Sequence, residues 1–203
     1  MTTTTMARDF DAVVIGASAG GVDALTQLAH ALPARFGKPV MVVMHLPPGR
    51  DSLLPALMAR RCPLRVKEAE DKEPLQPDTV YLAVPDYHLL VEPDRRLALS
   101  RDEPVQYSRP SIDLLFESAA LAYGERLLAI VLTGANNDGS AGLQTVRRFG
   151  GTAWVQDPRQ AQASLMPASA IAEAGADAVL TLEQIAEGLG GHAHPQKKGR
   201  GTT

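Results

Sequence analysis

The segment AVVIGASAGG, residues 12–21, joins a short apolar run to a turn rich in glycine. Polar side chains do not interrupt residues 12–16, which is typical of a strand covered on both faces. From Gly21 to Leu32 an apolar residue recurs at every third or fourth position, and this spacing predicts a helix with one buried face. A buried strand, a tight turn and an amphipathic helix together form the repeating unit of an α/β domain.

The same alternation continues along the chain. We expect further strands at 40–44, 127–132, 152–156 and 178–180, and further helices at 52–61, 111–123, 140–149, 167–174 and in a last segment ending at Leu189. This order predicts a doubly wound, mainly parallel sheet with helices on both faces. Short runs at 79–84, 89–92 and 97–100 are separated by Pro and Asp-Arg turns, and they predict an antiparallel β-hairpin insertion.

Composition limits the classes of function. The chain has 203 residues, 45% hydrophobic residues and a net charge of −3, so we expect one domain without a field that attracts nucleic acid or anionic lipid. One cysteine excludes an internal disulfide and fits the cytoplasm, and no apolar run reaches the ~20 residues of a membrane span.

Both ends of the chain are polar. We expect disordered tails at residues 1–10 and 190–203 around one domain at 11–189. The basic C-terminal tail offers a contact for nucleic acid or lipid headgroups, but a solvated tail is the simpler interpretation.

The first candidate site residue is Ser18, in the turn after the first strand. Residues 16–20 have the spacing G-x-S-x-G, in which the glycines allow a sharp turn that exposes a nucleophilic hydroxyl before a helix. A glycine-rich turn without chemistry, or a phosphate-binding loop, remains an alternative. A dinucleotide fingerprint would need glycine at Ser18, and a P-loop would need a lysine that is absent from this turn.

Two other predicted strands are followed by groups that could assist a serine. His45 ends the run VMVVMH, and Asp138 follows the strand at 127–132 in the sequence GANNDG. Each has a simpler interpretation, in which the histidine ends a strand with a hydrogen bond and the aspartate caps the next helix. The carboxyl ends of parallel strands meet at one edge of a sheet, so the three residues together predict a Ser-His-Asp site. His88, in the predicted insertion, is an alternative base.

Several co-linear motifs resemble one known family, the catalytic domain of the bacterial chemotaxis protein-glutamate methylesterases (CheB). They are VVIGASAGG, VVMHLPPG, TVYLAVPDYHLLVE, RPSIDLLFESAA, IVLTGANNDGSAGL and SLMP, and the resemblance extends from about Asp11 to Leu189. It implies a doubly wound α/β fold with a hairpin, and it places nucleophile, base and orienting acid at Ser18, His45 and Asp138.

This chain departs from the pattern of that family at four positions. Ala19 stands where a threonine is frequent, Ala135 and Asn136 replace the Met and Gly of G-M-G-x-D-G, and Ser108 replaces a histidine before R-P-S. The backbone N–H at position 135 can still donate to an oxyanion. Asn136 would matter if this position needs a positive φ.

The resemblance implies hydrolysis of glutamyl methyl esters on methyl-accepting chemotaxis receptors, with glutaminyl deamidation as a second reaction. Neither a metal nor an organic cofactor is needed, and the N–H groups of Ala19 and Ala135 are expected to bind the oxyanion. Arg109 is a candidate contact for acidic receptor side chains. Only about a dozen residues precede the first strand, so we expect no receiver domain within this sequence, and either constitutive activity or a separate regulator. A catalytically silent module that binds a receptor or another partner is the alternative.

Overall fold

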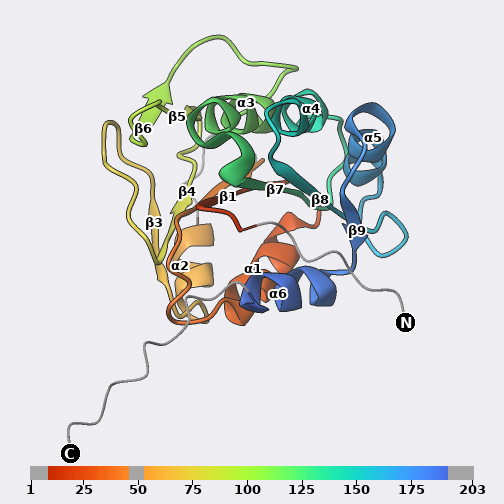
Figure 1. Ribbon diagram of the computed structural model, residues 1–203, viewed down its shortest axis with the longest axis horizontal. Coiled ribbons are helices and arrows are strands. Elements are labelled where there is room, and N and C mark those ends of the chain that lie inside the picture. Colours follow the sequence, from red (N-terminus) through yellow and green to blue (C-terminus); the bar gives the residue numbers. More distant parts are fainter. Residues whose placement is uncertain (1–8, 46–52, 192–203) are drawn as a thin grey trace, which may run out of the picture.

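The computed structural model describes residues 9–45 and 53–191. Strands and helices alternate along these residues, as Figure 1 shows. In chain order the elements are β1 (Ala12–Ala17), α1 (Gly21–Ala31), β2 (Val40–Met44), α2 (Leu54–Ala59), β3 (Arg65–Glu68), β4 (Thr79–Leu82), β5 (His88–Val91), β6 (Leu97–Ser100), α3 (Ile112–Tyr123), the 3-10 helix η1 (Gly124–Arg126), β7 (Leu127–Val131), α4 (Ser140–Arg148), β8 (Thr152–Gln156), α5 (Leu165–Ala174), β9 (Ala178–Leu180) and α6 (Leu182–Gly191).

A parallel sheet forms the centre of the domain. Among the described residues it has seven strands in the order β3-β4-β2-β1-β7-β8-β9, and each neighbouring pair is parallel. Strands β5 and β6 pair antiparallel with each other in a separate two-stranded sheet. The predicted fold class, a doubly wound parallel sheet with a hairpin insertion, is confirmed.

The prediction was wrong about the extent of the insertion. The run at 79–84 was expected to belong to the antiparallel part, but β4 lies within the parallel sheet, between β3 and β2. Strand β3 was not predicted at all. Its sequence RVKE is polar, with Arg65 and Glu68 exposed, because it is an edge strand, so it lacks the apolar run of a covered strand.

Helices cover both faces of the sheet. In Figure 1, α3, α4 and α5 lie on one side of it and α1, α2 and α6 on the other. Side chains alternate between the two cores along β1: Val13 and Ile15 belong to the core under α1, whereas Val14 belongs to the core under α3. Both layers are therefore held by the strand that also carries the Ser18 loop.

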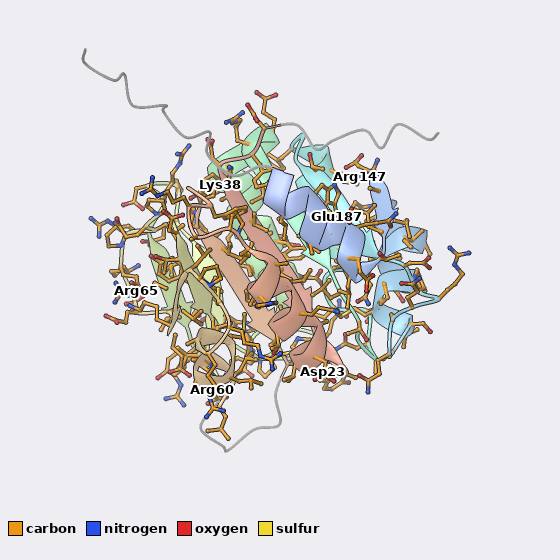
Figure 2. All side chains as sticks on the ribbon, turned by 90° about the horizontal axis from the view of Figure 1, so that it is seen from below. Asp23, Lys38, Arg60, Arg65, Arg147 and Glu187 are labelled. Carbon is orange, nitrogen blue, oxygen red and sulfur yellow. The ribbon has the colours of Figure 1, made fainter. Side chains whose placement is uncertain are left out.

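The two edges of the sheet can be followed in Figure 2, which views the α1 and α6 face. Lys38, two residues before β2, lies near the amino ends of the strands, and Asp23, in the first turn of α1, lies near their carboxyl ends. The predicted site residues all follow strands, so they belong to the edge marked by Asp23.

The ordered core extends slightly beyond the predicted limits of the domain. Phe10, assigned above to the N-terminal tail, is 2% exposed and packs against the ring of Phe36. Helix α6 continues to Gly191, two residues beyond the predicted end. The remaining predictions for the tails concern residues 1–8 and 192–203, which lie outside the described residues, as do residues 46–52 after His45. Within the described ranges, none of the helices combines the length and apolar character that crossing a bilayer requires.

Candidate active site

The predicted site lies where the sheet changes its direction of growth. On one side of β1 the sheet continues with β2, β4 and β3, and on the other side with β7, β8 and β9, which come later in the chain. Such a switch point leaves an opening at the carboxyl ends of the strands, because the connections on its two sides lead to opposite faces. Ser18, His45 and Asp138 follow β1, β2 and β7, the three adjacent strands at this point.

The Ser18 loop is a tight turn fixed to the neighbouring strand. The Ser18 N–H donates to the Thr133 carbonyl at 2.9 Å, and the Gly21 N–H donates back to the Ser18 carbonyl at 2.7 Å. Gly20 has a φ of 77°, a left-handed conformation in which a side chain would be strained. Ser18 is half-buried, and α1 begins three residues later. The turn therefore holds the serine at the amino end of a helix.

Thr133 holds this loop in place, and none of the predicted site residues included it. Its hydroxyl donates to the Ala19 carbonyl at 2.8 Å and accepts from the Ala163 N–H at 2.8 Å, and its own N–H donates to the Gln156 side chain at 2.8 Å. A threonine directly after a buried strand was the available signal, but strand propensity alone gives it an ordinary explanation.

His45 and Asp138 are joined directly. The distance from His45 Nε2 to Asp138 Oδ2 is 2.9 Å, across 93 positions of sequence. The side chain of His45 is 14% exposed and that of Asp138 only 1%. The side chain of His45 therefore bonds to the loop after β7, beyond the backbone bond with which it ends β2.

Asp138 also caps a helix, though not the one that follows it. Its carboxylate accepts hydrogen bonds from the N–H groups of Ile112 at 2.8 Å and Asp113 at 2.9 Å, and from the Ser111 hydroxyl at 3.1 Å. These donors lie at the amino end of α3, where free N–H groups favour an anion. The simpler interpretation, in which Asp138 caps the helix after it, named the wrong helix.

The surroundings keep Asp138 charged. Burial alone would raise the pKa of this carboxyl group, but hydrogen bonds from His45 and from the N–H groups of Ile112 and Asp113 outweigh burial and lower it. A charged Asp138 can only accept a hydrogen bond, so the proton between Asp138 and His45 is on Nε2. The other nitrogen of a neutral His45, Nδ1, then carries the lone pair that can take a proton.

Asp113, at the start of α3, caps the amino end of α4. Its Oδ1 accepts from the N–H groups of Gly139 at 2.9 Å and Gly142 at 2.7 Å, at the amino end of α4. Burial is the largest of the causes that raise the pKa of Asp113 to about 6, and the charge of Asp138 adds to it. Helices α3 and α4 thus exchange caps, which fixes the loop that carries Asp138.

Two backbone N–H groups beside Ser18 and Asp138 are candidate donors to an oxyanion. The N–H groups of Ala19 and Ala135 have no hydrogen-bond acceptor among the residues that the structure describes. Both residues are exposed, each in a loop at the carboxyl edge of the sheet. Free N–H groups in such positions are what an oxyanion site requires.

Among the described residues, the Ser18 hydroxyl and the His45 imidazole each have other surroundings. Within residues 9–45 and 53–191, neither imidazole nitrogen bonds to the Ser18 hydroxyl, because Nε2 bonds to Asp138 and Nδ1 lies 3.2 Å from Asn136 Nδ2. Strand register nevertheless places the two residues side by side: Ala17 pairs with Met44, and the His45 N–H donates to the Ala17 carbonyl at 3.1 Å. Neighbouring strands are about 4.8 Å apart, so the two side chains start from adjacent positions at the same edge of the sheet.

A hollow borders the Ser18 loop on the α1 side. It has a volume of about 530 Å³, and its lining includes Gly20, Asp23, Thr133 and Gln162. Among the described residues there is no group of three or more His, Cys, Asp or Glu side chains placed to hold a metal ion.

Two further predicted residues have other surroundings. His88 is fully buried, accepts a hydrogen bond from the Ser111 N–H at Nδ1 and lies 3.2 Å from the Glu103 carbonyl at Nε2, so both of its nitrogens are engaged away from Ser18. Arg109 pairs with Asp86 at 2.6 Å and donates to two backbone carbonyls. Its guanidinium group therefore holds loops of the insertion together, a role the sequence did not suggest.

Fold and site define a class of protein: a doubly wound α/β domain with a serine, a histidine and an aspartate at the switch point of its sheet. The family model described as CheB methylesterase matches residues 13–189. The chain belongs to this family, which is a family of hydrolases.

Two proteins illustrate the similarity. A putative protein-glutamate methylesterase/protein-glutamine glutaminase of Leptospira interrogans is 45% identical over 179 residues, which cover 88% of this chain and 93% of the relative. The crystal structure of the Thermotoga maritima CheB methylesterase catalytic domain matches with a TM-score of 0.84 and 35% identity, over 90% of this chain and 98% of that one. The chain spans about half the length of other relatives, such as the 52% covered in the full-length Thermotoga maritima enzyme.

Proposed function

We propose that this protein hydrolyses glutamyl methyl esters on chemotaxis receptors, with Ser18 as nucleophile, His45 as base and Asp138 as the acid that orients the base. The observation that carries the proposal is the 2.9 Å contact between His45 and a buried, charged Asp138. The two residues follow β2 and β7, the strands on either side of β1, which leads to Ser18. The names of its relatives support the substrate, since several are protein-glutamate methylesterase/protein-glutamine glutaminases.

The reaction follows from the chemistry of these groups. The Ser18 oxygen attacks the ester carbonyl carbon while its proton moves to His45 Nδ1, and Asp138 stabilises the imidazolium that results. The N–H groups of Ala19 and Ala135 would hold the oxyanion, and each such donor contributes about 2.7–4 kcal/mol in comparable sites. Methanol leaves with the proton from His45. Water then attacks the acyl-serine and gives the glutamate carboxyl group and free Ser18.

A glutamine side chain can enter the same sequence of steps. Its amide carbonyl replaces the ester carbonyl, and ammonia leaves in place of methanol. We therefore propose deamidation as a second reaction, in agreement with the glutaminase part of the relatives' names. The single cysteine fits a reducing compartment, and we place both reactions in the cytoplasm.

Ser18→Ala tests the proposal. Methylated receptors in membranes should release methanol with the wild-type protein and none above background with the variant, while the circular dichroism spectrum and the unfolding midpoint stay close to those of the wild type. Ser140→Ala is the matched control, because Ser140 is buried and its hydroxyl has no hydrogen-bond partner among the described residues. Full methanol release by Ser18→Ala would remove the nucleophile assignment.

His45→Gln tests the base. The variant should react with a fluorophosphonate at Ser18 at least about a hundredfold more slowly than the wild type, because a serine hydroxyl is a weak nucleophile without a proton acceptor. Mass spectrometry of the labelled peptide identifies the reacting residue. Labelling at a residue other than Ser18 would contradict the site.

A further inference from the structure

The side chain of Asn136 has a fixed orientation beside the proposed base. Its Oδ1 accepts a hydrogen bond from the Asp138 N–H at 3.3 Å, two positions further along the chain. A backbone N–H can only donate, so the amide oxygen of Asn136 faces Asp138 and its NH2 group faces the other way. That NH2 group lies 3.2 Å from His45 Nδ1.

This contact occupies the nitrogen that catalysis needs. His45 Nε2 donates to the charged Asp138, so Nδ1 is the ring atom with a lone pair, and a donor from Asn136 satisfies it. The Ser18 hydroxyl would need the same lone pair to transfer its proton. After proton transfer Nδ1 would carry a hydrogen and would face the hydrogens of the Asn136 amide, so this contact cannot persist through the reaction.

We propose that Asn136 is a positioning residue that holds His45 in a resting state and competes with Ser18 for Nδ1. This inference rests on the proposed function. The resting state turns active when the Asn136 amide swings away from the imidazole. The neighbouring residues Ala135 and Asn137 are exposed, so a protein substrate that docks on this loop would contact the segment that has to move.

The backbone conformation at position 136 tolerates a substitution that removes the amide. Asn136 is not among the described residues with a positive φ, so an alanine at this position introduces no strain. A neutral hydrogen bond of ordinary net strength corresponds to about a two- to tenfold shift in population. Removing the amide should therefore raise the rate at which Ser18 is activated by about two- to tenfold.

Three variants separate competition from a purely structural role. Asn136→Ala removes both hydrogen bonds of the side chain. Asn136→Asp keeps an oxygen for the Asp138 N–H and replaces only the group that faces His45, where an added carboxylate would pair with an imidazolium and so remove the base. Asn137→Ala is the matched control, because Asn137 is exposed and lies next to Asn136 in the same loop.

The readout is the second-order rate of Ser18 labelling by a small fluorophosphonate, in which a P–O bond forms, the P–F bond breaks and the proton passes to His45. We expect Asn136→Ala to react about two- to tenfold faster than wild type, Asn136→Asp to react more slowly, and Asn137→Ala to react at the wild-type rate. A structural role predicts the reverse order, with Asn136→Ala slower and Asn136→Asp preserved. In ¹⁵N spectra of the imidazole, the Nδ1 signal should move in Asn136→Ala, whereas Nε2 keeps its proton.

The outcomes distinguish the two proposals. Labelling of Ser18 at equal rates in wild type and Asn136→Ala, or faster in Asn136→Asp, would overturn the competition and leave the proposed function in place. Failure of Ser18 to react in the wild type and in every variant would overturn both.

Discussion

Asparagine at position 113 would remove a buried charge and keep the acceptor that α4 needs. Asp113 is 3% exposed, and its Oδ1 accepts from the N–H groups of Gly139 and Gly142. Its Oδ2 accepts from the Gln106 amide at 3.3 Å and from no other group in the described part of the chain. In the variant Asp113→Asn the carbonyl oxygen can take the place of Oδ1, and the NH2 group can face Gln106 once that amide has turned over. Negative charge is then the main property that the substitution removes.

The size of the effect follows from the pKa of Asp113. Burial, the largest cause, raises this pKa from 3.8 to about 6. Because the folded state holds the proton more tightly than the unfolded state, the free energy of unfolding falls as the pH rises through this interval. The interval corresponds to at most about 3 kcal/mol, and screening by solvent near the edge of the sheet reduces it. We expect Asp113→Asn to raise the free energy of unfolding by about 1–2 kcal/mol at neutral pH.

Urea unfolding of wild type and Asp113→Asn at about pH 7.5 and about pH 4.5 measures this gain. The gain should fall to less than half at the lower pH, because the wild-type carboxyl group is then mostly protonated in the folded state. Asp138→Asn is the matched control with the opposite sign. The pKa of Asp138 is lowered, so its charge stabilises the fold above the unfolded pKa and this stabilisation is lost as the pH falls through the folded pKa.

In the control variant, one oxygen of Asp138 becomes an NH2 group that faces N–H or O–H donors. Leaving these donors without an acceptor costs about 1–3 kcal/mol, so Asp138→Asn should lower the free energy of unfolding at neutral pH. A loss of stability in Asp113→Asn as large as that in Asp138→Asn would refute the reasoning. It would mean that the helix ends stabilise the charge of Asp113 by more than burial costs.

Two other substitutions test the packing around the site. Gly142→Ala should lower the free energy of unfolding by about 1–3 kcal/mol, because a Cβ there would lie 2.7 Å from Phe116 Cβ. Gly190→Ala is its control: the new Cβ would meet nothing within 4 Å, so thermal unfolding should show unchanged or increased stability. Thr133→Val should lower the free energy of unfolding by about 1–3 kcal/mol and slow the labelling of Ser18, because it leaves the Ala163 N–H without its acceptor. Thr133→Ser keeps the hydroxyl and should keep both the stability and the labelling rate. Equal labelling rates in the two variants would contradict the role of the hydroxyl.

Much of the fold could be predicted from the sequence, because covered strands have continuous apolar runs. The predicted bounds of β2, β6, β8 and β9 agree with the structure to the residue, and the other predicted elements differ by one or two positions at their described ends. Strand β3 could not be found in this way. It is held by pairing with β4 at the edge of the sheet, and edge pairing requires no apolar side chains.

The positions of the site residues were predicted from one rule, that side chains after parallel strands share an edge. This rule brought Ser18, His45 and Asp138 together, but it does not specify hydrogen bonds. The support from Ser111 and Asp113 depends on how α3 and α4 approach each other, and that from Thr133 on contacts with the loops at Ala19 and Ala163; no local sequence pattern indicates either. Arg109 was expected to contact acidic side chains of a receptor, and this stays a prediction; the sequence did not indicate that its guanidinium group pairs with Asp86.

The proposed acid differs from the other two site residues in how the fold holds it. Ser18 and His45 are positioned by backbone hydrogen bonds, and their side chains contribute little to holding the fold together. The Asp138 carboxylate is itself part of the fold, since it caps α3 and receives four of the hydrogen bonds described above. The N–H groups at the amino end of α3 keep this carboxylate charged, and the charged carboxylate fixes which nitrogen of His45 carries the proton. The amino end of α3 therefore sets the chemical state of the proposed base, which follows β2, and we expect loosening this helix end to change the reactivity of Ser18 without moving Ser18.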